Sequence, residues 1–162
     1  MSDRNRRPGS RRVSADRPRG QALVEFSIAV IPFLLLLMGV LDLGRGIYAL
    51  NATSEAAREI ARVTSVHRCS NTPCSDLATS SQSQDTIATQ RGLIPGLVFD
   101  PSTDVDCVDA TDTVVADAAC KPSSSTQLYI RVHVRSTFTP VTPLVAVFGT
   151  HTFESWSRIE LP

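Results

Sequence analysis

The residues that could carry chemistry in this chain are few and scattered. Its three histidines, His67, His133 and His151, lie far apart, and no nucleophile motif, phosphate-binding loop or paired-histidine metal motif accompanies them. Aspartates crowd residues 100–117, but this segment lacks the glycine and the final glutamate of a calcium-binding loop. The sequence therefore predicts no catalytic residue, no metal centre, no cofactor and no small-molecule substrate.

Four cysteines, Cys69, Cys74, Cys107 and Cys120, all follow the long apolar run of the chain. If that part of the chain is exported, its compartment favours disulfides. Four cysteines allow three pairings, and we favour the local one, Cys69–Cys74 with Cys107–Cys120, in which each bridge closes a short polar loop. The alternative is a zinc site at His67, Cys69 and Cys74, for which the sequence offers no second cluster of suitable spacing.

One carboxylate, Glu25, lies inside an otherwise uncharged apolar run from Ala22 to Leu41. As a helix rising 1.5 Å per residue, such a run is about 30 Å long, the thickness of a bilayer's hydrocarbon core. Pro32 does not exclude this interpretation, because membrane helices tolerate proline. The alternatives are a core helix of a soluble protein and a Glu25 that simply reaches the headgroup layer.

The residues around Glu25 form a processing pattern. A basic leader ends at Gly20, Glu25 is the fifth residue after it, and Phe26 follows. Prepilin peptidases cut such boundaries, and cleavage would give Gln21 a free α-amino group. In a bundle of packed helices Glu25 would face that group on a neighbouring subunit, which offsets the cost of a buried carboxylate and fixes the register. We assign Gly20 and Gln21 to processing, and Glu25, Phe26 and Pro32 to subunit assembly.

The distribution of charge predicts an orientation. Residues 1–20 hold seven arginines against two aspartates, whereas residues 63–162 are net acidic. Basic residues beside an apolar segment stay in the cytoplasm, so we expect a single-pass protein of the cytoplasmic (inner) membrane with an exported C-terminal part. The leader has no aromatic residues for base stacking, which argues against nucleic acid. An ordinary signal peptide would have a shorter apolar core, of about 7–15 residues.

Beyond the apolar run, the same helix is predicted to continue as an amphipathic helix to residue 66. Its apolar face would consist of Ile47, Leu50, Ala57, Ile60, Ala61 and Val63. Asp42 and Arg45, spaced i,i+3, would form an ion pair at the membrane exit. The predicted organisation is a disordered leader, a transmembrane helix, an amphipathic continuation and a loop-rich exported head, at 1–20, 21–41, 42–66 and 67–162.

The head is predicted to contain a small antiparallel sheet. Residues 127–138 alternate apolar and polar side chains, and residues 150–161 alternate again, so the two can pair across the connection at 140–149. Residues 92–99 are an edge-strand candidate, and residues 67–91 are predicted to be a surface loop with at most one turn of helix. The expected fold class is α+β: a long N-terminal helix, transmembrane then amphipathic, with the sheet packed on its exported half.

Residues 20–62 resemble the TadE-like family, which includes minor pseudopilins of tight-adherence (Flp, type IVb) pilus systems. The resemblance implies a non-enzymatic membrane protein of pilus assembly, whose partners would be the membrane, a prepilin peptidase, other pseudopilins, the major pilin and inner-membrane platform proteins. A membrane-tethered envelope enzyme and a secreted protein are the alternatives. The matching positions are Gly20, Glu25, Phe26, Pro32, Asp42, Gly44, Arg45, Tyr48, Asn51, Ala56, Ala57, Arg58 and Arg62.

Overall fold

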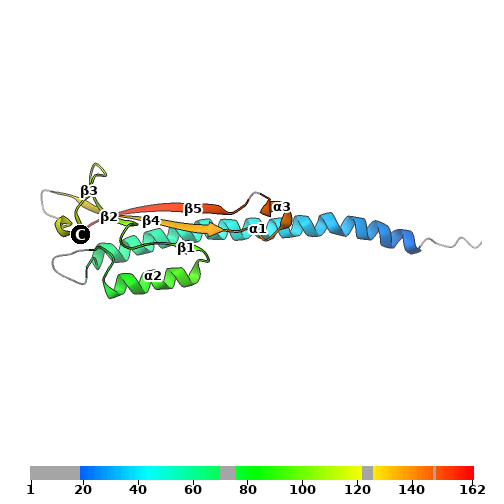
Figure 1. Cartoon of the computed structure of the whole chain (residues 1–162), viewed down its shortest axis with the longest axis horizontal. Helices are drawn as coiled ribbons and strands as arrows, with labels where there is room; N and C mark the ends of the chain where they lie inside the picture. Colours follow the sequence, from blue (N-terminus) through cyan, green and yellow to red (C-terminus); the bar gives the residue numbers. More distant parts are fainter. Residues whose placement is uncertain (1–18, 70–75, 122–125, 148) are drawn as a thin grey trace, which may run out of the picture. The chain divides into compact units, whose positions relative to one another are not determined.

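The structure, a computed structural model, describes residues 19–69, 76–121, 126–147 and 149–162 (Figure 1). The chain divides into two compact units, one up to Leu36 and one from Leu37 onward. Most of the predicted leader, residues 1–18, lies outside the described residues.

The first element is a single helix, α1 (Arg19–Val66), which continues through Pro32. In the first unit its large apolar side chains are exposed, among them Leu23, Phe26 and Leu36. Of the helices in the described ranges, α1 is the one long and apolar enough to cross a membrane. The predicted long N-terminal helix is therefore confirmed.

The second unit is built around a five-stranded antiparallel sheet (Figure 1). Its central strand β4 (Leu128–Phe138) pairs with β5 (His151–Glu160) without interruption, from Tyr129 opposite Glu160 to Phe138 opposite His151. This confirms the antiparallel pair predicted from the two alternating segments. The other edge of β4 pairs with two short strands, β1 (Leu97–Val98) and β2 (Val105–Asp109). Strand β3 (Val114–Val115) pairs with β2.

The core forms where the sheet covers the C-terminal part of α1. The inward residues of β4, Leu128, Ile130, Val132 and Val134, are all buried, as their alternation predicts. The buried residues in this part of α1 are small or medium-sized: Thr53, Ala56, Ala57, Ile60, Ala61, Thr64 and Ser65. Small side chains on this face leave room for the sheet to lie close to the helix.

The prediction of an apolar face on α1 was wrong at the N-terminal end of that face. Ile47 and Leu50 are exposed, and Val63 is only half-buried. Before Thr53 the covered positions of α1 include Asp42, which is buried, and Gly46 and Ala49, which are half-buried. Ile47 and Leu50 lie beside this covered line of residues. Periodicity identifies an apolar stripe, but it does not show how much of the stripe the sheet covers.

The predicted surface loop at 67–91 contains a helix of 13 residues, α2 (Ser81–Leu93). Ser80 caps it by accepting a 3.2 Å hydrogen bond from the Ser83 N–H, and both serine hydroxyls donate to the carbonyl of His67. Ile87 is its buried apolar residue. With so little apolar periodicity, the helix was not detectable as an amphipathic pattern.

The remaining elements are short. The 3-10 helix η1 (Asp117–Ala119) follows the β2–β3 hairpin, and α3 (Pro143–Ala146) lies in the β4–β5 connection. The hairpin turn is organised by Asp109, whose carboxylate accepts hydrogen bonds from the N–H groups of Thr111 and Thr113. Together the long helix and the antiparallel sheet confirm the α+β class.

Candidate functional site

The carboxylate of Asp42, in the second unit, accepts several hydrogen bonds and is almost fully buried. It accepts hydrogen bonds from the N–H of Thr142 (2.6 Å), from the Thr142 hydroxyl and from the N–H of Val141 (3.0 Å). Arg45 adds an ion pair at 3.0 Å. The Thr142 hydroxyl and then the Thr142 N–H are the main reasons that the pKa of Asp42 falls from 3.8 to about 2.

These contacts clasp the β4–β5 connection to α1, and we call Met38, Asp42, Arg45, Val141 and Thr142 the Asp42 clasp. The Thr142 hydroxyl also lies 3.4 Å from the carbonyl oxygen of Met38, one turn earlier on the helix. The sequence pointed to Arg45 as the partner of Asp42, but Thr142 was missed. A threonine between two prolines in an apolar connection was the available signal, and it does not identify a partner 100 positions away.

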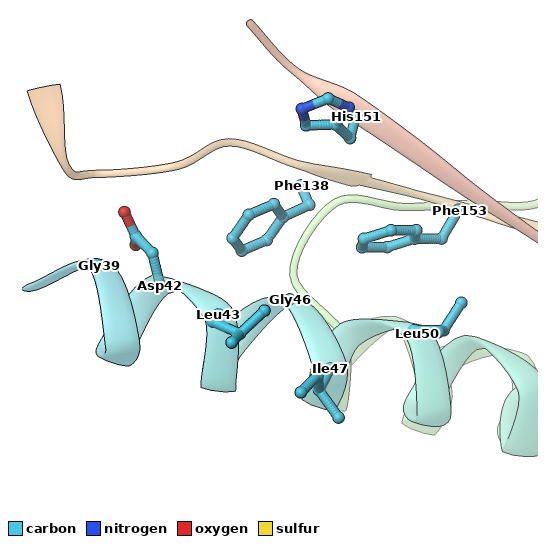
Figure 2. Close-up of a pocket in the computed structure, with 9 residues that line it drawn as sticks. All are labelled: Gly39, Asp42, Leu43, Gly46, Ile47, Leu50, Phe138, His151 and Phe153. Carbon is cyan, nitrogen blue, oxygen red and sulfur yellow. The ribbon is translucent and has the colours of Figure 1, made fainter. Parts of the chain in front are cut away.

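Beside the clasp, an apolar groove of about 500 Å³ lies between α1 and the ends of β4 and β5 (Figure 2). In Figure 2, Phe138 and Phe153 project from the strands toward the helix, and their ring centroids are 6.1 Å apart. A side chain at Gly46 would contact the Phe138 ring, 3.8 Å from the added carbon. The full lining is Gly39, Asp42, Leu43, Gly46, Ile47, Leu50, Phe138, His151 and Phe153.

The predicted processing and assembly residues all lie on the exposed surface of the first unit. Gly20 and Gln21 are in the first turn of α1, and Glu25, Phe26 and Pro32 follow on the same helix. Glu25 makes no hydrogen bond or ion pair with any residue that the structure describes. Its role in subunit assembly stays a prediction.

The structure contains the Cys107–Cys120 bridge of the local pairing scheme. Cys69 is also disulfide-bonded, while Cys74 lies outside the described residues, so the Cys69–Cys74 bridge stays a prediction. Among the described residues, no group of three or more histidine, cysteine, aspartate or glutamate side chains is placed to hold a metal ion.

The outward face of β4 and β5 carries a network of charged and aromatic side chains. Arg131 bridges Asp106 at 2.7 Å and Asp112 at 3.1 Å, which accounts for two of the acidic residues at 100–117. The ring of His133 stacks on Trp156 with centroids 3.7 Å apart. Asp106 and Asp112 of this crowded acidic segment thus take part in ion pairs of the sheet.

His133 and His151 do not form a pair. In the register of β4 and β5, His133 is opposite Trp156, whereas His151 is opposite Phe138 at the far end of the strands. His133 instead lies 3.8 Å from a carboxylate oxygen of Asp104. The arrangement is typical of a cross-strand surface network rather than of a catalytic dyad.

Comparison with known proteins supports the resemblance read from the sequence. The family model described as TadE-like protein matches residues 20–62, which lie entirely within α1 and include Glu25 and Asp42. No curated protein and no solved structure matched the chain. The match confirms that residues 20–62 form a TadE-like segment.

Proposed function

We propose that this chain is a non-enzymatic minor pseudopilin or assembly component of a tight-adherence (Flp, type IVb) pilus. The observation that carries the proposal is the exposed apolar surface of α1, which coincides with the TadE-like segment. A helix that exposes large apolar side chains over this length requires a bilayer or other helices around it. Association, rather than catalysis, is the activity that this surface supports.

In this proposal α1 anchors the protein in the cytoplasmic membrane, with the basic leader in the cytoplasm and residues 67–162 outside. A prepilin peptidase cuts between Gly20 and Gln21. Glu25 then pairs with the new N-terminus of a neighbouring pseudopilin or major pilin, which offsets the cost of placing a carboxylate among apolar helices. Phe26 and Pro32 shape the same helix–helix contact, and Asp42 with Arg45 marks the membrane exit.

The test is the N-terminal sequence and intact mass of the membrane-extracted protein, expressed with its pilus system. We expect a chain that begins at Gln21. The control is Gly20→Val, which should block cleavage because a branched side chain replaces the small residue before the scissile bond. A wild-type chain that retains residues 1–20 would make the protein an uncut anchor, and a start near residue 45 or later would indicate ordinary secretion.

The role of Glu25 is tested separately by Glu25→Ala, with Glu55→Ala as the matched control. Both glutamates are exposed on α1, but Glu55 lies outside the apolar run and only 3.8 Å from Arg58. We expect co-purification with other pilins to fall for Glu25→Ala and to be unchanged for Glu55→Ala. Equal co-purification of both variants with wild type would contradict the assembly role of Glu25.

A further inference from the structure

We propose that the β4–β5 connection, residues 139–147, is a second membrane contact that lies in the headgroup layer of the leaflet nearest the head. The proposal rests on the membrane anchor of the proposed function. It assigns a lipid-binding role to a segment of the C-terminal region, far in sequence from the TadE-like match at residues 20–62.

The first argument is that the Asp42 clasp fixes the depth of the connection. The N–H of Thr142 is 2.6 Å from the Asp42 carboxylate, and its hydroxyl is 3.4 Å from the carbonyl of Met38. Met38 and Leu41 form the last turn of the uncharged apolar run. If that turn is at the edge of the hydrocarbon, Thr142 must be there too, because hydrogen bonds to a helix turn leave it no freedom to move away.

The second argument is the apolar character of the side chains that the connection exposes. Val141 is 63% exposed and Val147 is 83% exposed, although both residues are aliphatic. Met38, Leu41 and Val141 also line a shared surface pocket, so the apolar surface of the helix continues onto the connection. An exposed apolar surface that extends a membrane helix is stabilised by lipid and destabilised by water.

The third argument is the absence of charge. Between Arg135 and Glu154 the sequence contains no aspartate, glutamate, lysine or arginine. A charged side chain near the hydrocarbon costs free energy because it loses its water, and this stretch contains no such side chain. Arg45 lies less than one turn beyond Asp42 on α1 and forms an ion pair with it. Its half-exposed guanidinium suits the phosphate layer.

The fourth argument concerns the backbone, whose polar groups must be satisfied in a water-poor layer. Pro140 and Pro143 have no N–H to satisfy. The N–H groups of Val141 and Thr142 donate to Asp42, and the N–H of Ala146 donates to the carbonyl of Thr142. At these five positions the connection brings no unpaired N–H group into the interface, which lowers the cost of removing it from water.

The experiment measures the depth of fluorophores in the full chain, reconstituted into phosphatidylcholine–phosphatidylglycerol vesicles under non-reducing conditions. The environment-sensitive dye NBD is attached to a cysteine introduced as Val147→Cys, or as Val141→Cys in a second variant. Val114→Cys is the matched control, since Val114 is 57% exposed but lies on β3. Leu36→Cys, on the apolar run, reports the anchor itself.

We expect lipids with a nitroxide near the headgroup to quench the dye at 147 and at 141, and to leave the dye at 114 unquenched. Aqueous iodide should quench the dye at 114 more strongly than the dyes at 147 and 141.

Suppose instead that the nitroxide lipid quenches the dye at 36, but iodide quenches the dyes at 147 and 141 as strongly as the dye at 114. That result refutes the interfacial contact and leaves the anchor in place. Protection of 147 and 141 from both quenchers would show a protein cover, such as a second copy, and would also overturn the proposal. A dye at 36 that lipid does not quench would refute the anchor, and the interfacial contact with it.

Discussion

The backbone N–H of Thr142 donates a 2.6 Å hydrogen bond to the carboxylate of Asp42, across 100 positions of the sequence. This bond joins the connection between the last two strands to the helix that begins the described chain. Two of the attachments between α1 and the sheet with its connection are the Asp42 clasp and the core around Ile60 and Ile130.

The clasp predicts a specific dependence of stability on pH. Because the pKa of Asp42 is about 2 in the folded protein and 3.8 ordinarily, the folded state binds fewer protons between these values. The stabilisation by Asp42 is therefore complete above about pH 4 and is lost as the pH falls toward 2. We expect Asp42→Asn to lower the thermal unfolding temperature in detergent at neutral pH, with the difference from wild type shrinking below pH 4. A difference that is the same at pH 7 and pH 2.5 would contradict this assignment.

Two isoleucines of α1 should differ sharply in their contribution to stability. Ile60 is 1% exposed in the core, so Ile60→Ala should lower the free energy of unfolding by about 2–5 kcal/mol. Ile47 is half-exposed in the apolar groove, so Ile47→Ala should change it by no more than about 0.5 kcal/mol. Denaturant unfolding of both variants checks this. A large loss of stability for Ile47→Ala would mean that the groove is part of the core.

The Cys107–Cys120 bridge closes a loop with a sequence separation of 13. By loop-closure entropy, its removal should cost about 3 kcal/mol. The double variant Cys107→Ala with Cys120→Ala, compared with wild type by denaturant unfolding without reductant, measures this cost. Intact mass before and after reduction serves as the control that the wild-type bridge is formed. An unchanged unfolding midpoint would show that the bridge adds no stability.

A buried pair of hydroxyls joins α1 to β4, and we expect the loss of one hydroxyl to destabilise the protein more than the loss of the other. Thr53 Oγ1 lies 2.6 Å from Ser136 Oγ and donates its own hydrogen to the carbonyl of Ala49, so Ser136 is the donor of the pair. Thr53→Val would leave the Ser136 hydroxyl without its acceptor, at a cost of about 1–3 kcal/mol. Ser136→Ala should lower the stability by less, because the Thr53 hydroxyl keeps its hydrogen bond to the carbonyl of Ala49.

The double variant is the check on this pair. If the two hydroxyls interact, Thr53→Val with Ser136→Ala should destabilise the protein by less than the sum of the single variants. Denaturant unfolding of all four proteins gives the coupling free energy. Strict additivity would mean that the contact contributes nothing beyond its separate side chains.

The parts of the fold that could be predicted are those with a strong local pattern. The long helix follows from an unbroken apolar run joined to an amphipathic segment, and β4 follows from the alternation of Leu128, Ile130, Val132 and Val134. Helix α2 was missed because its stability depends on the Ser80 cap and on one buried apolar residue, Ile87. A polar serine-rich segment has the same composition whether it forms a capped helix or a loop.

The candidate site was predictable only where its residues are close in sequence. The spacing of Asp42 and Arg45 indicates their ion pair, but nothing local connects Asp42 to Thr142. The groove could not be predicted either, because it lies between Ile47 and Leu50 of α1 and the ends of β4 and β5, which only the fold brings together. Such features depend on where tertiary cover ends, which is a property of the assembled sheet and helix.

The two attachments of the sheet to α1 also have a mechanical consequence. Asp42 and Ile60 are 18 positions apart on the helix, about 27 Å at 1.5 Å per residue. Within the second unit β4 and β5 run alongside this part of α1, and the clasp holds the connection between them (Figure 1). A pull along the helix would therefore be shared between the backbone of α1 and the two strands that lie alongside it.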